Sequence, residues 1–173
     1  KIFEIVTSPG GLRTDSYAAF DQTVKDGKTR VYLYNGNGWA LDQQALYRLD
    51  DARVAHAALF SAGANTAAWV NMTFPLQNPE DYQDWRVCNG QCVYDLVVAV
   101  PEGRPDTVYL GGQLSWVMGD PTVRSTNGGE SFTAVTIDRQ TPPGTPHVDV
   151  RAIVFSPDDQ DIVFIGSDGG VVR

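Results

Sequence analysis

Charged and aromatic side chains directly precede two apolar runs of the chain. The five residues are Tyr94, Asp95, His147, Asp149 and Arg151. The first two stand before LVVAV and the other three before AIVF. Carboxylate, imidazole and guanidinium groups gathered in one place can transfer protons or hold a polar ligand. Aligning Pro101 with Pro157 puts Asp95 opposite Arg151 in neighbouring structural units, so a ligand-binding cluster is one interpretation. A salt bridge between the units, or a satisfied turn, is the other.

Tryptophans beside predicted loops form a second set of candidate binding residues. They are Trp39, Trp69, Trp85 and Trp116. Exposed rings can stack on sugars or anchor a partner, whereas packing beneath long loops is the alternative. The acidic pair Asp158 and Asp159 could hold Ca²⁺ with backbone oxygens, but no ligand spacing supports that site. No other cofactor is expected, and Asp168 in GSDGG is expected to be a turn residue.

The two cysteines, Cys88 and Cys92, enclose the tripeptide NGQ. This spacing around an Asn-Gly turn favours a small disulfide loop. Half of a metal site is the alternative, but the only histidines, His56 and His147, are distant and differently spaced. A disulfide implies an oxidising compartment and therefore an extracellular, secreted or cell-surface protein. Asn71 begins an N-glycosylation acceptor pattern, which fits that location.

We expect Cys88 and Cys92 to be bonded to each other, since the chain has no other thiol. Mass spectrometry of peptides prepared without reductant should find the two joined in one closed loop. Two free thiols, or a metal held by both sulfurs, would contradict this pairing and the extracellular location with it.

Composition indicates a folded domain that does not bind nucleic acid. The chain has 173 residues, of which 42% are hydrophobic and 20% charged, and its net charge is −8. Such a balance argues against disorder, and the absence of a basic patch argues against a nucleic-acid partner. No apolar run approaches the roughly 18 residues of a membrane span. The chain begins at Lys1, which suggests processing or a start inside a longer polypeptide.

Internal repeats predict the fold. Residues 96–112 and 152–170 each contain an apolar strand, a proline, a polar turn, a second strand with an aromatic residue, and glycine. Residues 17–38 form a looser third copy. A third strand follows each copy, and short strands separated by Gly, Pro, Asp and Asn are typical of all-β proteins. Four antiparallel strands per unit predict a partial β-propeller with approximate blades at 1–60, 61–140 and 141–173, the last incomplete.

Such a fragment leaves a strand edge and apolar surface to be covered by remaining blades or by a partner chain. Expressed alone, it is expected to aggregate or to melt without cooperativity. The one helix expected from periodicity covers residues 49–60.

The stretch STNGGESF, residues 125–132, is expected to form a hairpin turn. Asn127 can bond the backbone N–H groups of its own turn, Gly129 tolerates positive φ, and Phe132 can anchor the next strand. Ser125 ends the preceding strand. This pattern resembles the Asp-box of sialidase-like propellers (bacterial neuraminidase repeats), Ser-x-Asp-x-Gly-x-Thr-Trp. Here Asn replaces Asp, Ser replaces Thr and Phe replaces Trp.

The surrounding strands are similar to blades of sortilin-like and xyloglucanase-like propellers. The resemblance covers most of residues 17–173 and implies a β-propeller fold. It carries over no catalytic residue, because the Asp-box lies at the blade periphery. The expected function is therefore an extracytoplasmic scaffold that binds a glycan or a protein through its loops. A secreted glycoside hydrolase completed by missing blades is the alternative, and a subunit of a larger extracellular assembly is another.

Overall fold

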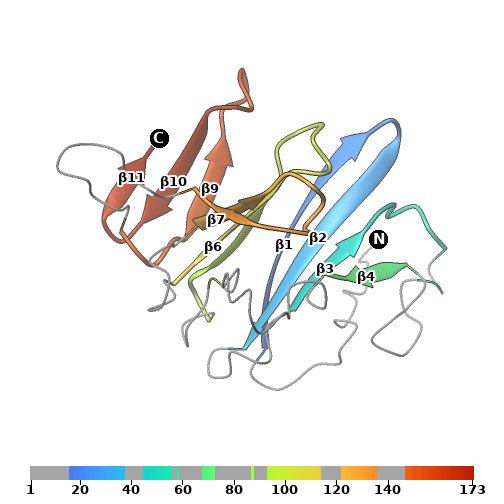
Figure 1. Ribbon diagram of the computed structural model, residues 1–173, viewed down its shortest axis with the longest axis horizontal. Helices are drawn as coiled ribbons and strands as arrows, with labels where there is room; N and C mark the ends of the chain where they lie inside the picture. The colour runs from blue at the N-terminus through green and yellow to red at the C-terminus, as the bar shows by residue number, and fades with distance from the viewer. Residues whose placement is uncertain are drawn as a thin grey trace, which may run out of the picture.

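The computed structural model describes residues 16–37, 45–55, 58, 68–72, 87, 93–113, 122–135 and 147–173. Their strands form three antiparallel sheets (Figure 1), which confirms the all-β class. The first sheet contains β1 (Ser16–Lys25), β2 (Lys28–Asn37), β3 (Ala45–Leu49) and β4 (Trp69–Asn71). The second contains β5 (Leu96–Ala99), β6 (Val108–Gly112), β7 (Thr122–Ser125) and β8 (Thr133–Ala134). The third contains β9 (Ala152–Phe155), β10 (Val163–Ser167) and β11 (Gly170–Val172).

Each sheet is a meander in which every strand pairs with the next strand of the chain. The turn between β1 and β2 consists of Asp26 and Gly27, with φ of 51° and 70°. Positive φ at both positions matches the twist of a two-residue hairpin, and Asp and Gly are residues that tolerate it. This two-residue turn therefore accounts for the first hairpin of the first meander.

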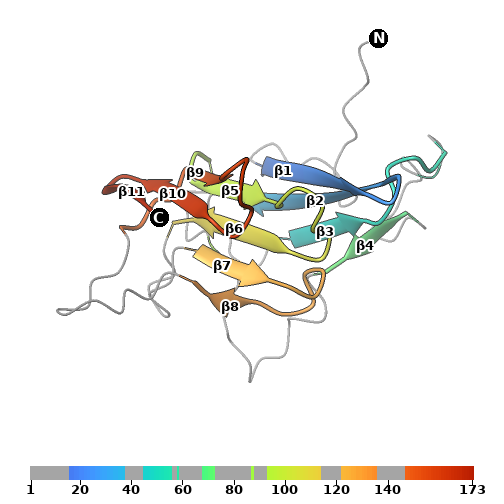
Figure 2. The same ribbon diagram turned by 90° about the horizontal axis from the view of Figure 1, so that it is seen from above.

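The second sheet lies between the other two, because the first strands of the three sheets contact one another in order. β1 contacts β5, and β5 contacts β9. Figure 2 shows the same order, with the first sheet at one side and β9–β11 at the other. Alternate residues of β5 consequently face opposite neighbours: Val98 packs toward the first sheet and Ala99 toward the third.

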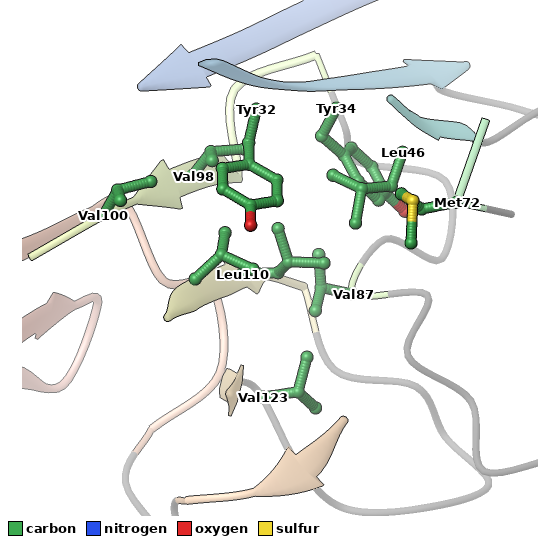
Figure 3. Packing of buried hydrophobic residues seen from close by; sticks show 10 residues of the cluster. Tyr32, Tyr34, Leu46, Met72, Val87, Val98, Val100, Leu110 and Val123 are labelled. Atoms are coloured by element: carbon green, nitrogen blue, oxygen red, sulfur yellow. The ribbon is translucent and has the colours of Figure 1, made fainter. Parts of the chain in front are cut away.

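The larger core fills the space between the first and second sheets (Figure 3). Tyr32 and Tyr34 of β2 are fully buried and point toward the side chains of the second sheet. Val98 of β5 and Leu110 of β6 meet them there. The smaller core joins the second and third sheets, where the ring of Tyr109 lies edge-on to that of Phe155 with centroids 5.3 Å apart. Burial of these side chains is the main force that holds the sheets together.

Polar contacts connect the sheets at the end where the β5–β6 turn lies. The N–H groups of Val100 and Gly103 donate to the Asp21 carboxylate and the Thr23 hydroxyl of β1, each over 2.8 Å. The Tyr32 hydroxyl donates to the carbonyl of Pro105 over 2.7 Å. Two ion pairs act at the same end: Arg30 with Asp106, and Arg104 with Asp161. The three hydrogen bonds give partners to backbone groups in and beside the β5–β6 turn, and so join the turn to the first sheet.

Two expectations about the first sheet differ from the structure. The sheet extends to Asn71, past the boundary expected at residue 60. The helix expected over 49–60 is wrong in its first half, where Leu49 ends β3 and a turn follows. The Asp51 carboxylate accepts the backbone N–H of Arg53 over 3.1 Å, and such a local bond competes with helix formation.

Candidate functional site

The five polar candidates lie at one end of the second and third sheets. The N–H of Val150 donates to the carbonyl of Gly112 over 3.1 Å, and Gly112 is paired with Leu96 at the start of β5. The N–H of Arg151 donates to the carbonyl of Gly166 over 2.9 Å. The first bond therefore holds the segment before β9 close to the beginning of β5, and the second bond joins the segment to β10. This end of the sheets is opposite to the β5–β6 turn.

Arg151 is the centre of the cluster. Its Nε lies 3.1 Å from Oδ1 of Asp95, and its Nη2 lies 3.0 Å from Oδ1 of Asp168. The guanidinium carbon lies 5.5 Å from the centre of the Tyr94 ring, within the range of a cation–π contact. Asp95 is completely buried, whereas the Arg151 and Asp168 side chains are about half exposed. The expected opposition of Asp95 and Arg151 is present in the structure as a salt bridge between sheets.

Asp95 has an altered acidity. Burial raises its pKa to about 6, and the negative charges of Asp149 and Asp168 act in the same direction while Arg151 opposes them. A hydrogen bond to the Asp149 side chain also raises the pKa of Asp95. Two carboxyl groups can share such a bond only when one of them carries a proton. The pair therefore favours a protonated Asp95 in mildly acidic solution.

The burial of Asp95 limits the chemistry of the cluster. Both carboxyl groups of a glycosidase act on a sugar, or on a water beside it, that lies between them. Asp95 is completely buried, so its carboxyl does not reach a sugar bound at the surface. The accessible part of the cluster is a rim formed by the Tyr94 ring, the Arg151 guanidinium and the Asp168 carboxylate.

Asp168 belongs to the cluster although the sequence predicted only a turn residue there. It lies with Gly169 in the two-residue connection between β10 and β11. The pairing of β9 with β10 brings this turn beside the start of β9, so the register of the repeated hairpin was the signal that could have identified Asp168. Asp149 has a left-handed φ of 64°, a conformation that Asp tolerates better than most residues.

The other candidates lie elsewhere. His147 is exposed and lies against Gly169, and its Nδ1 is 3.0 Å from the carbonyl of Val148. Trp69 lies on strand β4 and is buried with Tyr47 and Leu49, so it is not an exposed loop aromatic. Asn71, the glycosylation candidate, is a partly buried residue of the same strand. Six further candidates lie outside the described residues: Trp39, Trp85, Trp116, His56, Cys88 and Cys92.

The Asp-box-like turn is at the opposite end of the second sheet. Oδ1 of Asn127 accepts the N–H of Ser131 over 3.0 Å and the hydroxyl of Ser125 over 2.8 Å. The Ser125 oxygen in turn accepts the N–H of Gly129 over 2.9 Å, and Phe132 packs against the larger core. In the first sheet, Asp51 occupies the place in the turn after β3 that Asn127 has in the turn after β7. The next residue in each turn, Ala52 or Gly128, donates its N–H over 2.8 Å to the preceding hairpin.

We expect Asn127→Leu to destabilise the protein by about 1–2 kcal/mol, because the variant leaves the Ser131 N–H and the Ser125 hydroxyl without their acceptor. Asn127→Asp keeps that acceptor and is expected to be nearly neutral. Denaturant unfolding of the three proteins measures the difference. Equal midpoints for the Leu variant and the parent would exclude this role for Asn127.

No metal or membrane site emerges from the part of the chain that the structure describes. In those residues no group of three or more His, Cys, Asp or Glu is placed to hold a metal ion, and Asp158 and Asp159 are exposed turn residues. The same ranges contain no helix with the length and apolar character needed to cross a membrane. No family model matches the chain, and no curated protein or solved structure matches it.

Proposed function

We propose that the chain is part of a β-propeller that acts as an extracytoplasmic, non-catalytic scaffold and binds a glycan through the rim of Tyr94, Arg151 and Asp168. The adjacent first strands β1, β5 and β9 support the propeller arrangement, in which innermost strands surround one axis. The rim lies where β5 and β9 begin, at the entrance to that axis. An extracytoplasmic location is proposed from the closely spaced cysteines.

The observation that carries the non-catalytic proposal is the complete burial of Asp95. Burial keeps this carboxyl away from a bound sugar, whereas glycoside hydrolysis requires both carboxyl groups to act on it. The rim keeps the groups that bind sugars without reacting with them. A half-exposed ring offers an apolar face, and Arg151 and Asp168 offer a donor and an acceptor for hydroxyl groups.

Binding of a panel of biotinylated neutral and sialylated oligosaccharides tests the proposal. We expect Tyr94→Ala combined with Asp168→Asn to weaken binding about tenfold or more, which corresponds to about 1.4 kcal/mol. Glu130→Ala changes an exposed residue at the opposite end of the sheet and serves as the matched control. Binding that both proteins retain equally would exclude the rim as the binding site.

The same protein should be incubated with 4-nitrophenyl glycosides and with a sialyl substrate. The proposal predicts no hydrolysis above that of the Asp95→Asn variant. Hydrolysis that disappears in this variant would favour the glycoside hydrolase over the scaffold.

A further inference from the structure

Arg151 is the middle residue of the rim, and its backbone is fixed. The Arg151 N–H donates to the carbonyl of Gly166 over 2.9 Å, and the N–H of the preceding residue, Val150, donates to the carbonyl of Gly112 over 3.1 Å. From this backbone the side chain reaches to the start of β5, where its Nε lies 3.1 Å from Oδ1 of Asp95. A change of charge at Asp95 can therefore move the guanidinium group and leave the strands in place.

The position of the guanidinium beside the Tyr94 ring depends on Asp95. These two residues are consecutive, but the Tyr94 side chain is exposed and that of Asp95 is completely buried. The ion pair with Asp95 draws the guanidinium toward the residue next to Tyr94, and its central carbon lies 5.5 Å from the centre of the ring. The second partner of Arg151, Asp168, lies in the β10–β11 turn of the third sheet. Asp168 therefore holds Arg151 to its own sheet, and Asp95 holds it beside Tyr94.

The negative charge of Asp95 is poorly stabilised. Burial removes the carboxylate from water, and two further carboxylates face it: Asp149 from the segment before β9, and Asp168 from the β10–β11 turn. Arg151 supplies the opposing positive charge, but its side chain is half exposed, and water weakens the attraction. Burial, followed by the charge of Asp149, raises the pKa of Asp95 to about 6. Asp95 therefore gains a proton at a higher pH than an ordinary carboxylate does.

We propose that Asp95 is a positioning residue that assembles the rim when it is ionised and releases Arg151 when it gains a proton. In neutral solution, the ion pair holds the guanidinium beside the Tyr94 ring, so that one sugar can contact both groups. In mildly acidic solution, the protonated carboxyl no longer attracts the guanidinium, which keeps only its contact with Asp168 on the third sheet. The rim then releases its glycan. The release of the glycan rests on the proposed function, whereas the movement of Arg151 does not.

The fraction of ionised Asp95 sets the size of the effect. With a pKa of about 6, about nine tenths of the molecules have a protonated Asp95 at pH 5, and very few have one at pH 7.5. The apparent affinity of a ligand that binds one form of a protein falls in proportion to the population of that form. We therefore expect the Kd of a neutral oligosaccharide to be about tenfold higher at pH 5 than at pH 7.5. A neutral probe is used because its own charge does not change with pH.

Three variants separate Asp95 from other groups. Asp95→Asn should bind the oligosaccharide as weakly at pH 7.5 as the parent does at pH 5, and equally at both. His147 lies against Gly169, and histidine is a residue type that changes charge in the same pH range, so His147→Gln should keep the tenfold change. Glu130→Ala, at the opposite end of the sheet, is the matched control for affinity and pH dependence. A tenfold change that persists in Asp95→Asn or disappears in His147→Gln would overturn the proposal.

The free protein supplies a test that needs no glycan. The Nε signal of Arg151 in nuclear magnetic resonance spectra of ¹⁵N-labelled protein reports on the ion pair, and its loss in Arg151→Lys identifies it. We expect its chemical shift to change with a midpoint at about pH 6 in the parent and to stay constant over the same range in Asp95→Asn. A parent midpoint in the ordinary range of carboxyl groups, at about pH 4, would overturn the proposal.

The two measurements together distinguish this inference from the proposed function. An Arg151 signal with a midpoint at about pH 6, in a protein that binds no glycan at any pH, would refute glycan binding and support the release of Arg151. Glycan binding with the same Kd at pH 5 and pH 7.5 would overturn the inference and leave the rim as the binding site. Far-ultraviolet circular dichroism shows whether Asp95→Asn folds. If it does not, the midpoint of the Arg151 signal in the parent and in His147→Gln decides.

Discussion

Gly112→Ala is expected to destabilise the protein by about 3 kcal/mol or more, at the upper end of the cost of overpacking. A Cβ at this position would lie 2.6 Å from the carbonyl oxygen of Asp95 and 2.6 Å from that of Val87. Both contacts are with backbone atoms, which cannot rotate away as a side chain can. Relief would require β6 to move from β5, and Val150 would then lose its bond to the Gly112 carbonyl.

Denaturant unfolding at a fixed protein concentration measures this effect, and Gly166→Ala is the matched control. Its Cβ would meet only the Cβ of Ala152 at 3.5 Å, an ordinary contact, so the cost should stay below about 1 kcal/mol. The two glycines occupy neighbouring places in equivalent strands. The change in strand propensity from Gly to Ala is therefore similar in both variants and does not explain a difference between them. Equal stability of Gly112→Ala and the parent would mean that β5, β6 and the chain at Val87 do not approach as closely as the structure shows.

The sequence placed Asp95 opposite Arg151, with a salt bridge as one of the interpretations, from an alignment that the structure shifts by one residue. The proline alignment paired Pro101 with Pro157, whereas the turn hydrogen bonds of Thr107 and Ile162 pair it with Ser156. The prediction still identified the ion pair because the long arginine side chain bridges a displacement of one residue. Side-chain reach therefore compensates for a register error in repeats of this kind.

A short strand, a local side-chain bond and the register of paired strands explain the features that the sequence did not predict. β4 has three residues, WVN, and so carries too little alternation to be recognised as a strand. The apolar spacing after Leu49 predicts a helix, because spacing alone does not show that the Asp51 side chain accepts the backbone N–H of Arg53. Asp168 was assigned to a turn correctly, but only the pairing of β9 with β10 brings that turn to Arg151. Contacts between sheets depend on register, and periodicity does not determine register.

The Asp95→Asn variant is expected to become more stable, relative to the parent protein, as the pH rises. The folded pKa of Asp95 is about 6, above the ordinary value of 3.8, because burial disfavours the charged form. The stability that its proton contributes is therefore fully present below about pH 4 and is lost as the pH rises through about 6. The difference between the two pKa values corresponds to about 3 kcal/mol. We expect the unfolding free energy of the parent, relative to that of the variant, to fall by about this amount between pH 4 and pH 7.

Arg151→Met should destabilise the protein more at pH 7 than at pH 4. At pH 7 the variant leaves a buried, charged Asp95 without its guanidinium partner, and we expect a loss of about 2 kcal/mol, reduced from that of a fully buried pair because Arg151 is half exposed. At pH 4 Asp95 is protonated and the loss should be small. The decisive comparison is Arg151→Met in the Asp95→Asn background, where its cost at pH 7 should largely disappear. An equal cost in both backgrounds would mean that Arg151 stabilises the protein through Tyr94 and Asp168 alone. The charge of Arg151 would then not stabilise the buried Asp95 carboxylate.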